Sequence, residues 1–176
     1  MGDKREIETA RLVLTLPARH DFDAFASMRA DPLVARYTTR VPATPSESWE
    51  RLMRYRGFWE VLGFGFWSVR ERESGRFVGT VGFGENRRGI EPSLDGYPKA
   101  GWLLASWCHG KGFGKEGVAA ACAWLDRETG FTRSVCIIAP QNTASLGLAA
   151  LNGFTVFARS LYQGEEICVL ERSRSG

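Results

Sequence analysis

The stretch from Trp107 to Gly117 constrains the fold most strongly, because it joins a glycine-rich loop to the start of a helix. Glycines alternate at positions 110, 112 and 114, and an apolar pattern with helical spacing begins at Val118. Glycines let the backbone pass close to a ligand, and the first N–H groups of a helix have no partner inside it. The helix dipole adds about half a positive charge to those donors, which favours phosphate. The sequence therefore predicts a phosphate-binding loop here, against the alternative of a flexible loop before a core helix.

The size and composition of the chain fit one folded domain. Its 176 residues are 44% hydrophobic and 24% charged, as in an ordinary globular protein. We therefore expect a single domain over residues 1–176, with tails of about 1–6 and 173–176 that fray. The net charge of +3 is too small for a nucleic-acid surface unless the charges cluster, but it suits an anionic small ligand.

The sequence indicates neither membrane insertion nor a metal site. No 18-residue apolar span and no signal peptide pattern is present, so we expect a cytoplasmic protein, as a monomer or a homodimer. The cysteines lie far apart without a CxxC pair, and only His20 and His109 could join them as metal ligands. The four cysteines are Cys108, Cys122, Cys136 and Cys168. We expect no bound metal, and reduced, buried thiols at least at positions 122 and 136.

Apolar periodicity and turn residues divide the chain into elements in the order βααβββαβαββ. Strands are expected at 7–16, 64–70, 76–83, 100–105, 135–138, 154–161 and 167–171. Helices are expected at 21–30, from 45 onward, from the glycine loop to about 129, and at 144–151. Thr44 to Glu47 has the spacing of a capping box with proline at the first helical position, and the polar stretch Glu85 to Pro98 is typical of a loop. This order predicts one mixed α/β domain of the α+β kind.

The literal GxGxxG match at 112–117 raises a dinucleotide-binding Rossmann unit as an alternative. That unit needs an acidic residue about 20 positions on, at the end of the next strand, and this chain has Ala139 to Asn142 there. The elements before the motif also resemble antiparallel hairpins and not further βα units. A Walker A loop is excluded more simply, because Glu116 follows Lys115 where Ser or Thr would bind magnesium.

Four segments, taken together, match the pattern of one known family. The glycine loop, His109 to Gly114, reads His-Gly-Lys-Gly-Phe-Gly. Glu8 to Leu14 reads Glu-Thr-Ala-Arg-Leu-Val-Leu, Asp31 to Tyr37 reads Asp-Pro-Leu-Val-Ala-Arg-Tyr, and Asn142 to Ser145 is followed by Asn152 to Phe154. In order and spacing these segments resemble the acyl-CoA loop, the ETxRLxLR opening, the DPxVxRY segment and the NxxS…xGF pattern of the GCN5-related N-acetyltransferase (GNAT) family, in its ribosomal-protein (RimJ/RimL-like) branch. The resemblance spans nearly the whole chain.

The resemblance implies a mostly antiparallel, twisted sheet of about six to seven strands, flanked by about four helices. In that fold the fourth and fifth strands splay apart, and the pantetheine arm of acetyl-CoA lies between them. The residues that the resemblance assigns to the cofactor are Trp102, Leu103, Leu104 and Ala105 for the arm and the thioester carbonyl, His109, Gly110, Lys111, Gly112, Phe113, Gly114 and Lys115 for the pyrophosphate loop, and Asn142 and Ser145 for the pantetheine.

The implied reaction is acetyl transfer from acetyl-CoA to a primary amine, either a protein N-terminus or a small molecule, by direct attack in a ternary complex. An amine with a pKa near 10.4 must first lose a proton, so a base is expected. Glu85 and Asp95 are the candidates, and Ser145 is a candidate beside the leaving sulfur. The chain departs from the family where His109 replaces an Arg or Gln, and where Ala149 stands at the place of a general-acid tyrosine.

These departures leave alternatives open. A non-catalytic acyl-CoA-binding or regulatory module is the second hypothesis, motivated by the missing tyrosine. The pair Cys108 and His109 suggests a nucleophilic cysteine, although neighbours on an extended segment point to opposite faces. Lys99 lies about where some relatives have a glutamate, so the identity of the base is not fixed by the resemblance.

Overall fold

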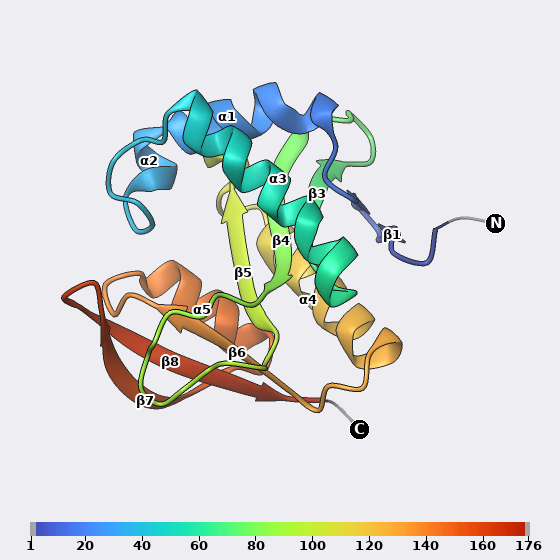
Figure 1. Ribbon diagram of the computed structural model, residues 1–176. Coiled ribbons are helices and arrows are strands. Elements are labelled where there is room, and N and C mark those ends of the chain that lie inside the picture. The colour runs from blue at the N-terminus through green and yellow to red at the C-terminus, as the bar shows by residue number, and fades with distance from the viewer. Residues whose placement is uncertain (1–2, 175–176) are drawn as a thin grey trace.

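The computed structural model describes residues 3–174, and they form one eight-stranded sheet with five α-helices (Figure 1). The strands are β1 (Ile7–Glu8), β2 (Leu12–Thr15), β3 (Phe66–Glu71), β4 (Phe77–Gly84), β5 (Lys99–Leu104), β6 (Arg133–Ile138), β7 (Thr155–Tyr162) and β8 (Glu165–Ser173). The helices are α1 (Phe22–Ala30), α2 (Pro32–Ala35), α3 (Pro45–Leu62), α4 (Phe113–Glu128) and α5 (Thr143–Leu151), with 3-10 turns η1 (Arg19–Asp21) and η2 (Ser106–Cys108). The sheet order is β1-β2-β3-β4-β5-β6-β8-β7, and only β5 and β6 pair in parallel.

The mixed, mostly antiparallel sheet confirms the predicted fold class, but it holds one more strand and one more helix than expected. The predicted first strand, 7–16, is broken because Thr9 turns the chain: its N–H donates to the Leu12 carbonyl, and its hydroxyl accepts from the Leu12 N–H at 3.0 Å. The additional helix is α2, where Pro32 occupies the first turn and the Asp31 carboxylate accepts from the Leu33 N–H at 2.9 Å.

Two predicted local signals are confirmed in detail. At the start of α3, the Thr44 hydroxyl accepts from the Glu47 N–H at 3.3 Å, and the Glu47 carboxylate accepts from the Thr44 N–H at 2.7 Å. The β7–β8 turn consists of Gln163 and Gly164, both with positive φ, which suits the twist of a two-residue hairpin.

Side chains from both faces of the sheet form the core. Neighbouring residues on a strand point to opposite faces, so Phe66 packs with Phe25 of α1 and Tyr55 of α3, while Trp67 lies in the cluster that includes α4. Figure 1 shows α1 and α3 running across the face nearer the viewer, with α4 beside the other face. Trp124 of α4 stacks edge to face on Trp67 at 5.2 Å. The sheet therefore has a helical layer on each face, with β5 near its centre.

Two indole groups fasten the amino end of the chain to this core. Trp67 Nε1 donates to the Arg5 carbonyl, and Trp124 Nε1 donates to the Lys4 carbonyl at 2.9 Å. The tail expected to fray is thus held at these two residues, and β8 extends to Ser173. Residues 1–2 and 175–176 of the expected tails lie outside the described part of the chain. Among residues 3–174, no helix combines the length and apolarity that crossing a membrane requires.

Candidate functional site

A wedge opens between β5 and β6. The two strands pair only at Lys99 and Val135, close to their amino ends. Each is held along its length by its outer neighbour, β5 by β4 and β6 by β8, so they diverge toward their carboxyl ends. Among the predicted arm residues, Trp102 to Leu104 lie on β5 along this opening, and Ala105 follows directly. The divergence exposes backbone groups of β5 that a sheet partner would otherwise occupy.

The predicted residues Trp102, Asn142 and Ser145 lie together at this wedge. Trp102 Nε1 donates to Ser145 Oγ at 3.2 Å, which joins β5 to α5. Asn142 is the N-cap of α5, and its carboxamide oxygen accepts from the Ser145 N–H at 3.1 Å. One side of the wedge is therefore bounded by a short hydrogen-bonded chain from β5 to the first turn of α5.

The glycine loop ends at the start of α4, near the carboxyl end of β5. Gly110 and Gly112 have φ of 75° and 79°, a left-handed conformation that favours glycine, and Gly112 is the N-cap of α4. Glycine is favoured at position 114 for a different reason, which is close packing: a Cβ there would lie 2.8 Å from Leu104 Cδ1 and 3.0 Å from Leu148 Cδ2. The loop thus brings the first turn of a 16-residue helix directly against the wedge. The N–H groups of that turn, from Phe113 to Lys115, lie at the positive end of the helix dipole and would stabilise an anion bound there.

A latch from the turn between β1 and β2 holds this loop in place. We call Arg11 and Glu116, with Thr9, the latch. Arg11 Nε donates to the Glu116 carboxylate at 2.7 Å, and Arg11 Nη1 donates to the Lys111 carbonyl at 2.9 Å. The Glu116 carboxylate also accepts from the Thr9 hydroxyl at 2.6 Å and the Arg11 N–H at 2.8 Å, and these donors outweigh burial and lower its pKa. Arg11 also lies over the Phe113 ring at 4.6 Å.

His109 fixes the entry to the loop. Its Nε2 lies 2.9 Å from the Leu104 carbonyl, and because a carbonyl only accepts, Nε2 carries the proton. The Asp31 carboxylate accepts from the Ser106 hydroxyl at 2.6 Å, and this bond is the main cause of a lowered Asp31 pKa. The segment at Asp31 is thus tied to η2, just before His109.

Cys108 lies in a setting that opposes nucleophilic chemistry. Its side chain is buried, and its thiol lies 3.0 Å from the Ala105 carbonyl. Burial raises the pKa of the Cys108 thiol, which disfavours the thiolate that a nucleophile requires. All four cysteines are free and buried, as predicted for positions 122 and 136. Within residues 3–174, no group of three His, Cys, Asp or Glu side chains could hold a metal ion.

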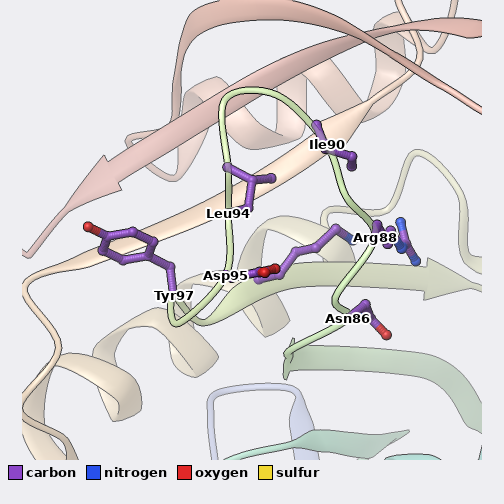
Figure 2. A pocket seen from close by; sticks show the side chains of 7 residues that line it. Asn86, Arg88, Ile90, Leu94, Asp95 and Tyr97 are labelled. Atoms are coloured by element: carbon purple, nitrogen blue, oxygen red, sulfur yellow. The ribbon is translucent and has the colours of Figure 1, made fainter.

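The two candidate carboxylates lie at opposite ends of the loop between β4 and β5, residues 85–98. Figure 2 shows this loop as an arch with Asn86 and Arg88 on one limb and Asp95 and Tyr97 on the other. Glu85 forms an ion pair with Arg87 Nε at 2.8 Å and accepts a hydrogen bond from the Gly96 N–H at 3.2 Å, so it closes the base of the arch. Asp95 lines a pocket of about 10 Å³, the room of about one water molecule, together with Lys99. Among the described residues, no hydrogen bond joins either carboxylate to Ser145.

Apolar contacts fasten the arch to the sheet. Ile90 and Leu94 are buried and pack with Val135, Ile167 and Val169 of β6 and β8. The sequence pattern predicted the loop but not these apolar contacts, although two large apolar residues within a polar stretch could have indicated them. The arch is therefore fixed on the sheet beside Val135, where β5 and β6 pair.

Lys99, at the start of β5, is the most perturbed basic group of this region. Desolvation lowers its pKa to about 7, and the positive charges of Arg88, Arg51 and Arg54 add to the effect. An unfolded lysine titrates near 10.4. Between about pH 7 and 10.4 the unfolded chain therefore binds a proton that the folded chain has lost, and stability rises with pH across this window.

Lys99→Met is accordingly expected to raise the melting temperature more at pH 6 than at pH 9. At pH 6 the folded wild type carries the charge in its unfavourable surroundings, whereas at pH 9 more than half of that cost is gone. Thermal unfolding of both proteins at the two pH values measures the difference. Lys115→Met, an exposed lysine of α4, controls for the loss of a lysine. An equal gain at pH 6 and pH 9 would contradict the assigned environment.

Comparisons with known proteins agree with this geometry. The model of the acetyltransferase (GNAT) domain family matches residues 11–155. A solved structure from Bordetella pertussis, described as a GNAT-family acetyltransferase, is 32% identical, with a TM-score of 0.85 over 96% of this chain and 99% of that one. An acetyltransferase from Agrobacterium tumefaciens shares the fold at 23% identity, with a TM-score of 0.80 over 94% of this chain and 92% of that one.

Ribosomal-protein acetyltransferases are also among the structures with this fold. RimL, a ribosomal L7/L12 α-N-protein acetyltransferase solved with coenzyme A, is 14% identical, with a TM-score of 0.77 over 96% of this chain and 97% of that one. Together with the family match over most of the chain, the wedge and the glycine loop lead to one conclusion. The chain belongs to the GNAT family, whose members are acetyltransferases that use acetyl-CoA.

Proposed function

We propose that this protein transfers the acetyl group of acetyl-CoA to a primary amine, by direct attack within a ternary complex. One observation carries the proposal: a wedge between β5 and β6 that opens beside the first turn of α4. An arm lying in the wedge and a diphosphate at the helix start match the two parts of coenzyme A. The acceptor class remains an amine of a protein N-terminus or of a small molecule, and the resemblance to the ribosomal-protein branch supports the former.

We assign the cofactor side to three segments. Trp102, Leu103, Leu104 and Ala105 would pair with the arm, because their side of β5 has no strand partner beyond Lys99. The loop His109, Gly110, Lys111, Gly112, Phe113, Gly114 and Lys115 would hold the diphosphate through backbone N–H groups and two lysine charges. Asn142 and Ser145 would contact the pantetheine at the first turn of α5.

The reaction requires three contributions from the chain: a donor to the thioester oxygen, a base for the amine, and a group beside the leaving sulfur. A backbone N–H at β5 would stabilise the charge that develops on the thioester oxygen, a contribution that reaches several kcal/mol in other enzymes. A base must take the proton of the amine, directly or through water. Asp95 is favoured for this role because it lines the pocket beside Lys99, while Glu85 is engaged with Arg87 and Gly96.

Ser145 is proposed to serve the leaving sulfur. Its oxygen accepts from Trp102 Nε1, so its own proton is free to point elsewhere. A thiolate with a pKa near 8.5 leaves without a strong acid, so a hydroxyl in place of the tyrosine that Ala149 replaces would be sufficient. Ala149 itself is fully buried and offers no proton.

Acetyl-CoA is expected to raise the melting temperature, because a ligand that binds only the native state stabilises that state. At a ligand concentration of 100 times the Kd, the free energy of unfolding rises by about 2.7 kcal/mol. NADH at the same concentration is the control, since it tests the dinucleotide alternative for the same glycines. A panel of peptides, amino sugars and polyamines, followed by the thiol released, then tests transfer. Absence of any shift at millimolar acetyl-CoA would contradict the binding assignment. A shift without turnover on any amine would point to an acyl-CoA-binding module.

A further inference from the structure

Four positively charged side chains lie within electrostatic reach of one another near the amino end of β5. Arg51 and Arg54 lie on α3, Arg88 on the arch of residues 85–98, and Lys99 at the start of β5. Their charges act on one another: Arg51 and Arg88 lower the pKa of Arg54, and all three arginines lower that of Lys99. Elements that are far apart in sequence therefore bring cations close together.

The three arginines of this cluster have no acidic partner. Among residues 3–174, no carboxylate lies within 4 Å of the guanidinium groups of Arg51, Arg54 or Arg88, and these groups donate no hydrogen bond within the chain. Arg88 lies over the Tyr162 ring at 4.9 Å, and Arg51 over the Tyr55 ring at 5.9 Å. These planar groups keep their donor forks available for an anion.

The surface beside Arg51 and Arg54 is an open groove. Arg51 and Arg54 line a groove of about 540 Å³ between α3 and the loop that precedes it. Two acids, Glu47 and Glu50, line the same groove, but the Glu47 carboxylate is occupied by the N-cap of α3. Arg40 of the loop before α3 forms an ion pair with Glu165 at the β7–β8 turn at 2.9 Å. This ion pair joins that loop to the β7–β8 hairpin.

We propose that the acceptor amine belongs to a molecule that also carries a carboxylate or phosphate, which Arg51, Arg54 and Arg88 bind. This inference rests on the proposed transferase function and specifies its substrate class. Cations placed close together without counter-charges repel one another, and a bound anion removes that cost. The same positive field disfavours an ammonium, so it favours the neutral amine that attacks the thioester. The attraction between the anionic group of the acceptor and the arginines then holds the acceptor in place, although the same arginines repel a protonated amine.

Matched acceptors test the proposal. A peptide that begins Ser-Glu-Asp-Glu is compared with one that begins Ser-Gln-Asn-Gln, and O-phosphoethanolamine with ethanolamine. Acetylation is followed by the thiol released, with wild type, Arg54→Gln, Arg88→Gln and the control Arg127→Gln. Arg127 lies in the last turn of α4 and pairs with Glu128, away from the cluster. The thermal shift with acetyl-CoA checks that each variant folds and binds the donor.

The anionic member of at least one pair is expected to have a kcat/KM about tenfold or more above its neutral partner. Arg54→Gln and Arg88→Gln should each lower that value by about tenfold through KM, lower the value for the neutral partner by a clearly smaller factor and leave the acetyl-CoA shift intact. The pair that shows the preference distinguishes an acidic peptide from a small phosphorylated amine. Equal rates within both pairs would overturn the inference while leaving the transferase in place. Absence of turnover on every acceptor would count against the transferase itself.

Discussion

Gly82→Ala is expected to lower the free energy of unfolding by about 3 kcal/mol or more, the upper end of what overpacking costs. Gly82 lies in the middle of β4 with φ of 156°, between Phe66 of β3 and Gly101 of β5. A Cβ there would overlap with the Gly65 carbonyl oxygen and Phe66 Cα. Both obstacles are backbone atoms, so no rotamer change relieves the clash, and the strands must separate.

Chemical denaturation measures this effect through the midpoint of unfolding. Gly57→Ala is the matched control, because Gly57 lies within α3 and a Cβ there meets nothing within 4 Å. The control should gain up to about 1 kcal/mol, since alanine favours the helix over glycine. A Gly82→Ala midpoint equal to that of the wild type would mean that β3 and β4 are not packed as closely as the structure describes.

Local rules allowed the sequence to predict the elements that depend on neighbours along the chain. The capping box from Thr44 to Glu47 and the turn at Gln163 and Gly164 involve groups at most three residues apart, and both are confirmed. The break of the first strand at Thr9 was missed, because one hydroxyl that bonds the backbone of Leu12 decides it. Alternation of apolar residues alone does not reveal such a bond.

The candidate site depends on contacts between residues that are distant in sequence, and local sequence patterns do not predict such contacts. The glycine loop and its helix were predicted from the spacing, and the resemblance supplied the splayed strands. The latch was not anticipated, since Arg11 and Glu116 are 105 positions apart and each is an ordinary surface residue in isolation. The low pKa of Lys99 likewise comes first from desolvation and then from charges on α3 and on the arch, and only the fold brings these about.

The catalytic assignments show the same limit. Glu85 and Asp95 were equivalent in the sequence, as two carboxylates of one polar loop. The structure separates them, because Glu85 is engaged with Arg87 and Gly96, while Asp95 lines the pocket beside Lys99. Asp95 as the base and Ser145 beside the sulfur remain predictions.

Arg11→Ala is expected to weaken acetyl-CoA binding about tenfold, because it removes charge-assisted hydrogen bonds that hold the loop. Arg11 joins the Lys111 carbonyl to the Glu116 carboxylate, and without it the first turn of α4 loses its tie to the amino-terminal strands. Titration calorimetry with acetyl-CoA measures the change, with Arg127→Ala as the control for a lost charge on α4. An unchanged affinity would mean that the loop keeps its shape without the latch.

Glu116→Gln decides whether Arg11 acts by holding the loop or by attracting phosphate. The substitution removes a negative charge beside the proposed diphosphate site and frees Arg11 from its 2.7 Å ion pair. If Arg11 served mainly as a phosphate-binding cation, the affinity for acetyl-CoA would rise, since an opposing charge has gone. If the latch holds the loop, the affinity falls as it does in Arg11→Ala, and the double variant is no weaker than the single ones. We expect the fall, because the carboxylate gathers three donors from Thr9 and Arg11 and thereby fixes the helix start on which every backbone donor of the site depends.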